Sequence, residues 1–132
     1  MHWIFDNNIS FKKRALQLFR KQSIECETYK EYIQFLGVKS ENITEIEDIP
    51  FLPISFFKSH QVKSKSKKFD LVFESSGTTG DQTSKHYIVD KKIYEYSFEK
   101  GFENFYCDIS KYRILALLPS YLKQKNSSLV YM

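Results

Sequence analysis

The residues best suited to chemistry lie in one polar stretch, Ser75-Ser76-Gly77-Thr78-Thr79-Gly80. The chain has only four glycines, and two of them, Gly77 and Gly80, lie within this stretch. Glycine permits backbone conformations that other residues resist, so neighbouring N–H groups can turn toward an anion. The stretch also holds four hydroxyl side chains, those of Ser75, Ser76, Thr78 and Thr79. It therefore predicts a loop that wraps a polyphosphate, with Lys85 as an added positive charge.

A solvated hairpin loop is the alternative interpretation of the same stretch, because serine, threonine and glycine are ordinary loop formers. Two common nucleotide motifs are absent. Asp81 follows Gly80 where the Walker A motif needs lysine, and the GxGxxG spacing of dinucleotide-binding proteins does not occur. Residue types alone leave both interpretations open.

The flanking sequence indicates how the loop is held. Phe69, Leu71 and Phe73 occupy every second position before it, as in a strand with one buried face. A short extended run, residues 86–89, follows it. We expect a strand, the polar loop and a second strand. His86 is either a secondary phosphate contact or a histidine at the edge of the second strand.

Two further elements are expected after the hairpin. Asp90 can cap a long helix, which Gly101 weakens in its middle. The expected buried stripe of that helix consists of Tyr94, Phe98, Phe102 and Phe105. This stripe is either core or the lining of a fatty-acyl tunnel. Residues 112–118 form an apolar run that ends at Pro119, which predicts a buried strand.

Helices are expected before residue 48. One runs from Ser10, its N-cap, to about Gln22. Its expected apolar stripe consists of Phe11, Ala15, Leu18 and Phe19. A second begins near Thr28, which has capping-box spacing to Glu31, and stops at Gly37.

A polar connector is expected at residues 38–50, with one short turn. Beyond it Pro53 can open a short helix. That helix would press Ile54, Phe56 and Phe57 onto the body of the protein.

The expected fold is α/β, with N-terminal helices followed by strand, loop, strand, helix and strand. Residues 1–48 form a helical lead-in, and residues 49–132 form the segment that carries the loop. The chain ends on Ser127 and Ser128 with the first apolar residues of a new element. This suggests an incomplete domain, whose exposed Leu129 and Val130 would favour self-association.

Composition narrows the function classes. The 132 residues are 42% hydrophobic with a net charge of +4, typical of a globular protein. Neither a membrane span nor a secretory signal is evident, so we expect a cytoplasmic protein. The basic signal is confined to residues 58–68, which have five lysines and no acid. This run is either a solvated connector or a contact for RNA or an anionic membrane. No aromatic residue interrupts residues 63–68 to stack a base, and no nucleic-acid partner is expected.

Cysteines and histidines give no sign of a metal centre. Cys26 and Cys107 lack metal or redox spacing, so we expect free thiols. His2, His60 and His86 are scattered, and no metal site is predicted.

Ser75–Gly80 resembles the phosphate loop of the adenylate-forming superfamily, which has the form [ST]-SGTTG-x-PK and includes acyl-CoA synthetases, luciferases and peptide-synthetase adenylation domains. Three more stretches resemble its acyl-protein synthetase branch, the fatty-acid activating subunit of bacterial luminescence systems. These stretches are IPFLPISFFKSH at 49–60, SKHYIVD at 84–90 and LALLPSYLKQKNSSLVYM at 115–132. Together with the loop, the similarity covers roughly residues 45–132.

The resemblance implies the large N-terminal domain of such an enzyme and a two-step reaction. A carboxylic acid would react with ATP to give an acyl adenylate and pyrophosphate, and a thiol would then take the acyl group. Ser75 to Gly80 would hold the β- and γ-phosphates, with Mg²⁺ spreading the charge of the leaving group. The thiol would belong to a protein cysteine or to coenzyme A.

The chain departs from the family pattern at two places. Lys85 lies two positions beyond the family's lysine, and Pro119 is followed by Ser120 and Tyr121 without the family's histidine. Tyr121 is a candidate for shaping the acyl pocket. The family's adenine-site motifs, magnesium-binding acid, C-terminal lysine and acyl-accepting cysteine are expected beyond Met132. No catalytic residue is therefore assigned here, and the isolated piece is expected to lack turnover.

Two other functions remain open. An acyl-CoA ligase would use the same loop and differ only in its acceptor. A non-catalytic module would hold a phosphate-containing ligand or a partner protein through the loop.

Overall fold

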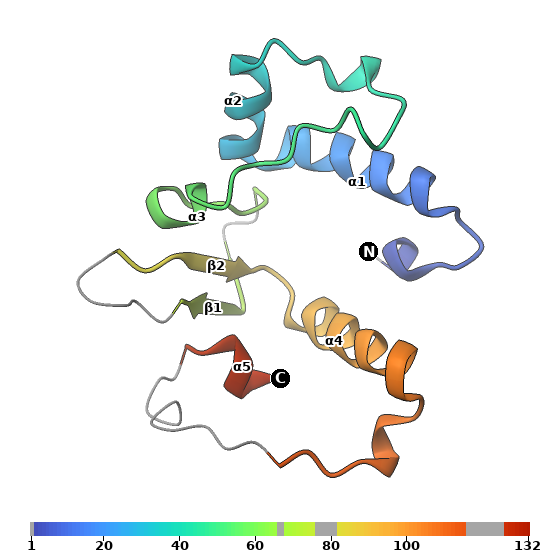
Figure 1. Cartoon of the computed structure of the whole chain (residues 1–132). Coiled ribbons are helices and arrows are strands. Elements are labelled where there is room, and N and C mark those ends of the chain that lie inside the picture. Colours follow the sequence, from blue (N-terminus) through green and yellow to red (C-terminus); the bar gives the residue numbers. More distant parts are fainter. Residues whose placement is uncertain (1, 66–67, 76–81, 116–125) are drawn as a thin grey trace. The chain divides into compact units, whose positions relative to one another are not determined.

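The computed structural model describes four stretches of the chain, residues 2–65, 68–75, 82–115 and 126–132 (Figure 1). Contacts divide the chain into two compact units, Met1–Lys67 and Lys68–Met132. The described part of the first unit is helical. The second combines helices with a two-stranded antiparallel sheet. This mixture is consistent with the expected α/β class.

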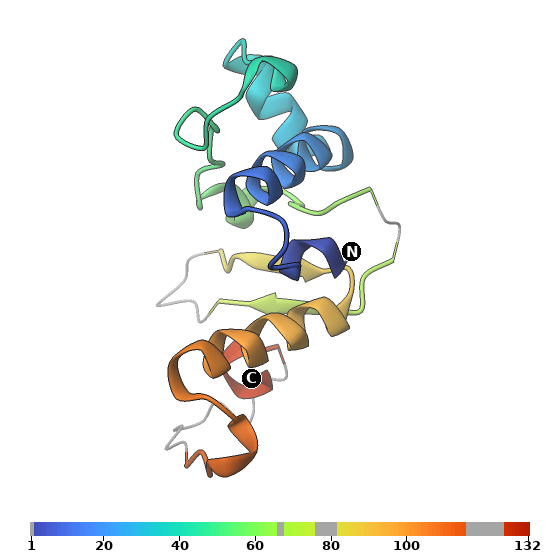
Figure 2. The same cartoon turned by 90° about the vertical axis from the view of Figure 1, so that its right-hand side faces the viewer.

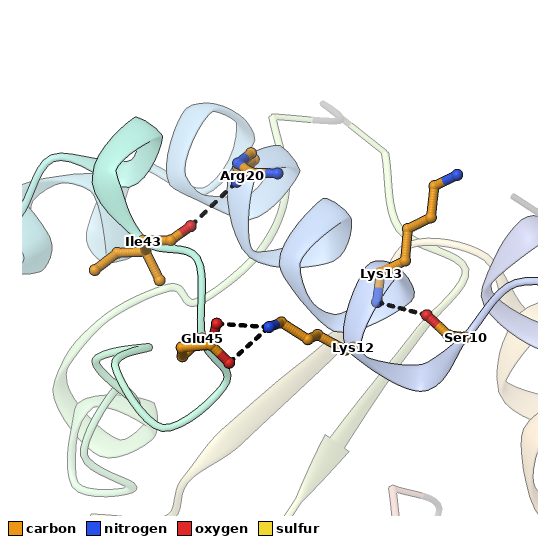
Figure 3. A network of polar contacts seen from close by, with 6 residues as sticks. All are labelled: Ser10, Lys12, Lys13, Arg20, Ile43 and Glu45. Atoms are coloured by element: carbon orange, nitrogen blue, oxygen red, sulfur yellow. Dashed lines mark hydrogen bonds and ion pairs between the residues drawn. The ribbon is translucent and has the colours of Figure 1, made fainter.

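Helix α1 (Phe11–Glu25) follows the 3₁₀ helix η1 (His2–Phe5). Ser10 caps α1 as predicted, because its Oγ accepts a hydrogen bond from the Lys13 backbone N–H at 3.4 Å (Figure 3). This bond satisfies one of the N–H groups that have no partner within a helix.

The buried stripe of α1 is Leu16, Phe19 and Ser23, which follow one another at helical spacing. Of the predicted stripe only Phe19 is fully buried. Including Phe11 was wrong, since 69% of it is exposed. The packing of α1 against the next helix turns the stripe toward Leu16 and Ser23.

Helix α2 (Glu27–Phe35) begins directly after Cys26, which is its N-cap. The predicted Thr28–Glu31 capping box was wrong, because α2 has already begun when the chain reaches Thr28. The Thr28 hydroxyl instead donates to the Gln61 carbonyl at 3.5 Å.

Gly37 ends α2 as predicted. Its φ of +69° is a left-handed conformation that favours glycine. The Gly37 N–H donates to the Gln34 carbonyl and the Val38 N–H to the Ile33 carbonyl, both at 2.9 Å. These two bonds form a Schellman motif, which satisfies carbonyls left over at the helix end.

The connector after α2 contains the short 3₁₀ helix η2 (Ser40–Asn42) and lies along α1 (Figure 1). The Lys12 ammonium contacts the Glu45 carboxylate at 2.6 Å, and the Arg20 guanidinium donates to the Ile43 carbonyl at 3.1 Å (Figure 3). Both contacts are exposed, and the Lys12–Glu45 ion pair contributes at most about 1 kcal/mol.

Helix α3 (Phe56–Ser59) follows Pro53, whose carbonyl accepts the Phe56 N–H at 3.0 Å. Phe56 and Phe57 are half-buried, as expected. Ile54 is 81% exposed, so its predicted packing was wrong. It lies two residues before Phe56 on this helical turn, and such residues face different sides.

The core of the first unit includes residues beyond the predicted helical lead-in. Its buried members are Leu16, Phe19, Cys26, Tyr29, Ile33 and Ile49, with Leu52 and Val62 packed against them. The first compact unit therefore extends past residue 48 and ends at Lys67.

In the second unit, helix α4 (Lys91–Tyr106) follows the two strands in the chain (Figure 2). Asp90 caps it as predicted, because its carboxylate accepts the Lys92 N–H at 2.9 Å. Tyr94, Phe98 and Phe102 are half-buried, whereas Phe105 is 83% exposed and does not belong to the stripe. Cys107 follows the helix as an exposed free thiol, while the free thiol of Cys26 is buried.

The predicted strand at 112–118 was wrong for its described part. After the 3₁₀ helix η3 (Ile109–Lys111), Tyr112–Leu115 has no strand structure and is exposed. The described sheet contains only the hairpin strands, so nothing pairs with this segment there. Residues 116–118 lie outside the described residues.

The final element is helix α5 (Ser128–Tyr131). Leu129 is 55% exposed and Val130 37%, and self-association stays a prediction. Among the described residues, no helix is both long and apolar enough to cross a membrane.

Candidate functional site

The candidate site is the stem of a β-hairpin. Strand β1 (Leu71–Glu74) pairs in antiparallel fashion with strand β2 (Lys85–Ile88), from Leu71 opposite Ile88 to Glu74 opposite Lys85. This confirms the two predicted strands, while residues 76–81 of the predicted loop lie outside the described residues. The loop therefore leaves one strand and enters the next at neighbouring positions.

Ser75 and Ser84 close the stem beyond the last strand pair. The Ser75 N–H donates to the Ser84 carbonyl at 3.0 Å, and the Ser84 N–H donates to Ser75 Oγ at 3.0 Å. The Ser75 hydroxyl thus uses one acceptor position, and its proton remains available for donation to another group. This closure was not predicted, because it joins residues on both sides of the loop.

Glu74 and Lys85 face each other at the same end of the stem. Hydrogen bonding between Ser75 and Ser84 makes the neighbouring Glu74–Lys85 pair a non-hydrogen-bonded one, in which side chains are closer. The Lys85 ammonium lies 3.8 Å from Glu74 Oε1, and both side chains are partly exposed. Lys85 was predicted, whereas Glu74 was not assigned a partner, although its place in the strand alternation could have indicated one.

The opposite face of the hairpin is covered only in part, because His86 on this face is exposed. Phe73 and Ile88 are buried, and His86 lies opposite Phe73 in the strand register. Partial burial lowers the pKa of His86, because the charged ring is poorly solvated there. His86 therefore lies within β2, on the face opposite to Lys85.

Aromatic rings support this partly covered face. The Phe73 ring lies 5.1 Å from Tyr94 of α4 and 5.4 Å from Tyr131 of α5, and Tyr94 lies 5.6 Å from Phe98. The Tyr131 hydroxyl also donates to the Glu95 carboxylate at 2.6 Å. For Tyr94 and Phe98, these contacts match packing in the core.

A distant segment reaches the outer edge of β1. The Glu74 N–H, which points away from β2, donates to the Asn126 carbonyl at 2.9 Å. Sequence reasoning missed this contact because no local pattern links the two residues. One end of β1 is therefore hydrogen-bonded on both sides.

Several predicted site residues lie outside the described part. They are Ser76, Gly77, Thr78, Thr79, Gly80 and Tyr121. Of the predicted set, the structure places Ser75 and Lys85 together at the stem. Among the described residues, no group of three His, Cys, Asp or Glu side chains could hold a metal ion.

The described stem offers defined chemistry at the two ends of the loop. Ser75 presents a hydroxyl proton, and Lys85 presents a cation whose charge is partly balanced by Glu74. An anion that enters the loop would compete with Glu74 for Lys85. Since the ion pair is exposed, such an exchange costs little, at most about 1 kcal/mol.

Comparison with known proteins gives two matches. A family model described as acyl-protein synthetase, LuxE, matches residues 2–96, which include both hairpin strands and the loop between them. A long-chain-fatty-acid–luciferin-component ligase of Photorhabdus luminescens is 41% identical over 70 residues.

The match to this ligase covers 52% of the chain and 60% of the curated relative. The chain thus spans less than two thirds of the length of that relative. No solved structure matches the chain.

Proposed function

Because the chain belongs to the LuxE acyl-protein synthetase family, we propose that it supplies the phosphate loop of an enzyme that activates fatty acids with ATP. The relative named as a long-chain-fatty-acid ligase supports a fatty acid as the substrate class. The proposed loop is Ser75 to Gly80, within the adenylate-forming superfamily pattern.

The proposed reaction has two steps. A carboxylate oxygen of the fatty acid attacks the α-phosphorus of ATP, the bond to the β-phosphate oxygen breaks, and pyrophosphate leaves. A thiolate then attacks the acyl carbonyl, and AMP leaves with the electrons of the acyl–oxygen bond. The family description, acyl-protein synthetase, favours a protein as the acceptor over coenzyme A.

The single observation that carries the proposal is the double hydrogen bond between Ser75 and Ser84. It fixes both ends of the sequence that includes Gly77 and Gly80. Backbone N–H groups that are positioned before the reaction stabilise developing charge without a further ordering cost. We therefore assign the loop to orientation and charge stabilisation of the β- and γ-phosphates.

Lys85 and Ser75 act at the base of this loop. Lys85 would exchange Glu74 for a phosphate oxygen, and the Ser75 hydroxyl would donate its free proton to another. Lys85 is a point charge on a flexible stem, so it can follow the anion without a fixed geometry.

Mg²⁺ fits this site through the nucleotide. Magnesium commonly binds substrate phosphates with one or two carboxylates, and keeps several waters. When bound, it would spread the charge of the departing pyrophosphate. We propose no protein ligand for it from this chain, and Tyr121 is the proposed contact for the acyl group.

Carboxylate-dependent exchange between ATP and pyrophosphate tests the proposal, measured on the protein at its full natural length. Gly77→Ala and Thr78→Ala are expected to lower the exchange rate by at least about tenfold, because each disturbs a phosphate contact. Gly101→Ala is the matched control. It adds the same methyl group in α4, where the Cβ would meet open space.

Unchanged exchange in both loop variants would remove the loop from the mechanism. Exchange without any added carboxylic acid would contradict the activation step. Transfer to coenzyme A instead of a protein thiol would retain the loop's role and replace the proposed acceptor.

A further inference from the structure

We propose that the segment from Phe51 to Lys65 binds the surface of an anionic lipid bilayer. This inference is independent of the nucleotide site. It rests on exposed apolar side chains that lie beside a local excess of positive charge in the first unit.

Two large apolar side chains of this segment face solvent. Phe51 is 73% exposed, although it directly precedes Leu52, which packs on the core, and Ile54 is 81% exposed. Together they expose apolar area that a water-facing connector does not need.

The helical turn around α3 places charge beside this apolar surface. The Phe57 N–H donates to the Ile54 carbonyl and the Lys58 N–H to the Ser55 carbonyl, so this stretch is helical. Residues three and four apart share one side of a helix, which brings the half-buried Phe57 and the exposed Lys58 to the side of Ile54. Phe56 points elsewhere and packs on Tyr32, with ring centroids 5.6 Å apart.

Packing fixes the orientation of this turn. The Tyr29 hydroxyl of α2 donates to the Pro50 carbonyl before the turn at 2.8 Å, and the Thr28 hydroxyl of α2 donates to the Gln61 carbonyl after it at 3.5 Å. Both ends of the turn are therefore held to the helical unit. Ile54 and Lys58 are presented outward on a structured support.

The charge of the segment has one sign. No acidic residue occurs from Ile49 to Phe69, while Lys58, Lys63 and Lys65 add positive charge within the described part. Exposed apolar side chains with neighbouring lysines and no acids match the requirements of an anionic membrane surface. A nucleic-acid site would need aromatic residues among residues 63–68, and none occurs there.

Co-sedimentation of the full chain with lipid vesicles tests the proposal. We expect binding to vesicles that contain phosphatidylserine, weak binding to pure phosphatidylcholine vesicles, and release by about 0.5 M salt, which screens charges. Each lysine near such a surface strengthens binding about fivefold, so the double variant with Lys58→Gln and Lys65→Gln should bind about 25-fold more weakly.

The matched control makes the same change of charge outside the segment. Lys13→Gln with Lys39→Gln removes two exposed lysines of the same unit outside the segment, and it should leave binding nearly unchanged. Phe51→Ser and Ile54→Ser should each weaken binding about tenfold, whereas Phe35→Ser, at a residue 89% exposed at the far end of α2, should not.

Several results would overturn the proposal. One is an equal loss of vesicle binding in the Lys58/Lys65 and Lys13/Lys39 double variants, and another is equal binding to neutral and anionic vesicles. A third is displacement of the protein from vesicles by millimolar glycerol phosphate, which would indicate a site for a free anion. Tighter binding to an RNA oligomer than to the anionic vesicles would also identify nucleic acid, instead of lipid, as the partner. Far-UV circular dichroism checks that each variant keeps its helices.

Discussion

Lys85 lies across the hairpin stem from Glu74, with its ammonium 3.8 Å from Glu74 Oε1. The pair stands at the point where the chain leaves β1 and enters β2. In the proposed enzyme this makes Glu74 a competitor of the nucleotide, since carboxylate and phosphate bind the same cation. The stem is therefore coupled to the loop, because Lys85 binds either Glu74 or the nucleotide.

The first prediction concerns this competition. Lys85→Gln should raise KM for ATP about fivefold, and Glu74→Gln should lower it about twofold, since the neutral amide leaves Lys85 to the phosphates. Both changes in KM correspond to at most about 1 kcal/mol, which is the free energy that an exposed ion pair contributes. Steady-state kinetics of the full-length protein would measure them. Lys92→Gln on α4 is the control, and an equal rise in KM there would show a general charge effect.

The second prediction concerns the Ser75 hydroxyl. Ser75→Ala removes the acceptor of the Ser84 N–H, and should cost about 1 kcal/mol locally, which is about fivefold faster hydrogen exchange at that amide. Ser84→Ala keeps both bonds, because Ser84 contributes only backbone atoms to them. Nuclear magnetic resonance would measure exchange of the backbone amide at position 84 in each variant. Equal protection in both variants would show that the hydroxyl does not hold the stem.

The third prediction concerns Tyr29 and pH. Burial, with smaller contributions from Tyr32 and Cys26, raises the pKa of Tyr29 to about 12. The folded protein therefore keeps the phenol proton between about pH 10 and 12, whereas the unfolded chain releases it near pH 10. The free energy of unfolding should fall across this range. Below about pH 10 the contribution of Tyr29 is complete.

Tyr29→Phe isolates this contribution. The variant lacks the hydrogen bond to the Pro50 carbonyl and should lose about 1 kcal/mol of stability at about pH 8. Its stability should fall less steeply from about pH 10 to 12 than that of the native chain. Urea titrations at several pH values would measure both effects, with Tyr32→Phe as the control. A parallel pH profile in Tyr29→Phe would rule out Tyr29 as the titrating group.

The fourth prediction compares two glycines. Gly37→Ala places a Cβ at φ +69° and should lower stability by about 1 kcal/mol, because left-handed backbone is unfavourable for alanine. Gly101→Ala should raise stability by about 0.5–1 kcal/mol, since it lies inside α4 with open space at the Cβ. Thermal unfolding would measure both. Changes of the same sign would contradict the assigned conformations.

Local patterns were enough to predict several elements. Ser10 and Asp90 were recognised as caps because capping depends on neighbouring backbone N–H groups. Gly37 was recognised as the end of α2 because glycine favours the left-handed backbone of a helix end. The hairpin followed from alternation in β1 and the polar loop beyond it. Each of these features is decided within a few residues.

Packing between distant segments was harder to predict. Phe11 and Ile54 are apolar residues at helical spacing, yet both side chains are exposed. No residue of the described core of the first unit packs over them. Tyr112–Leu115 belongs to an apolar run, but a strand also needs a partner, which no described strand provides. At the site, Lys85 was predicted from charge alone. Its partner Glu74 and the contact with Asn126 depend on register and tertiary folding.

The bond between the Glu74 amide and the Asn126 carbonyl also sets an order of events during translation. The two residues lie on opposite sides of α4 in the sequence, so β1 emerges from the ribosome long before its second neighbour is made. Until then β1 has an open edge, which is able to pair with other chains. Helices α1 and α2 are consecutive in the chain, so they can pack together as soon as both have been made. The nascent helical unit can therefore fold while the hairpin still depends on residues to come.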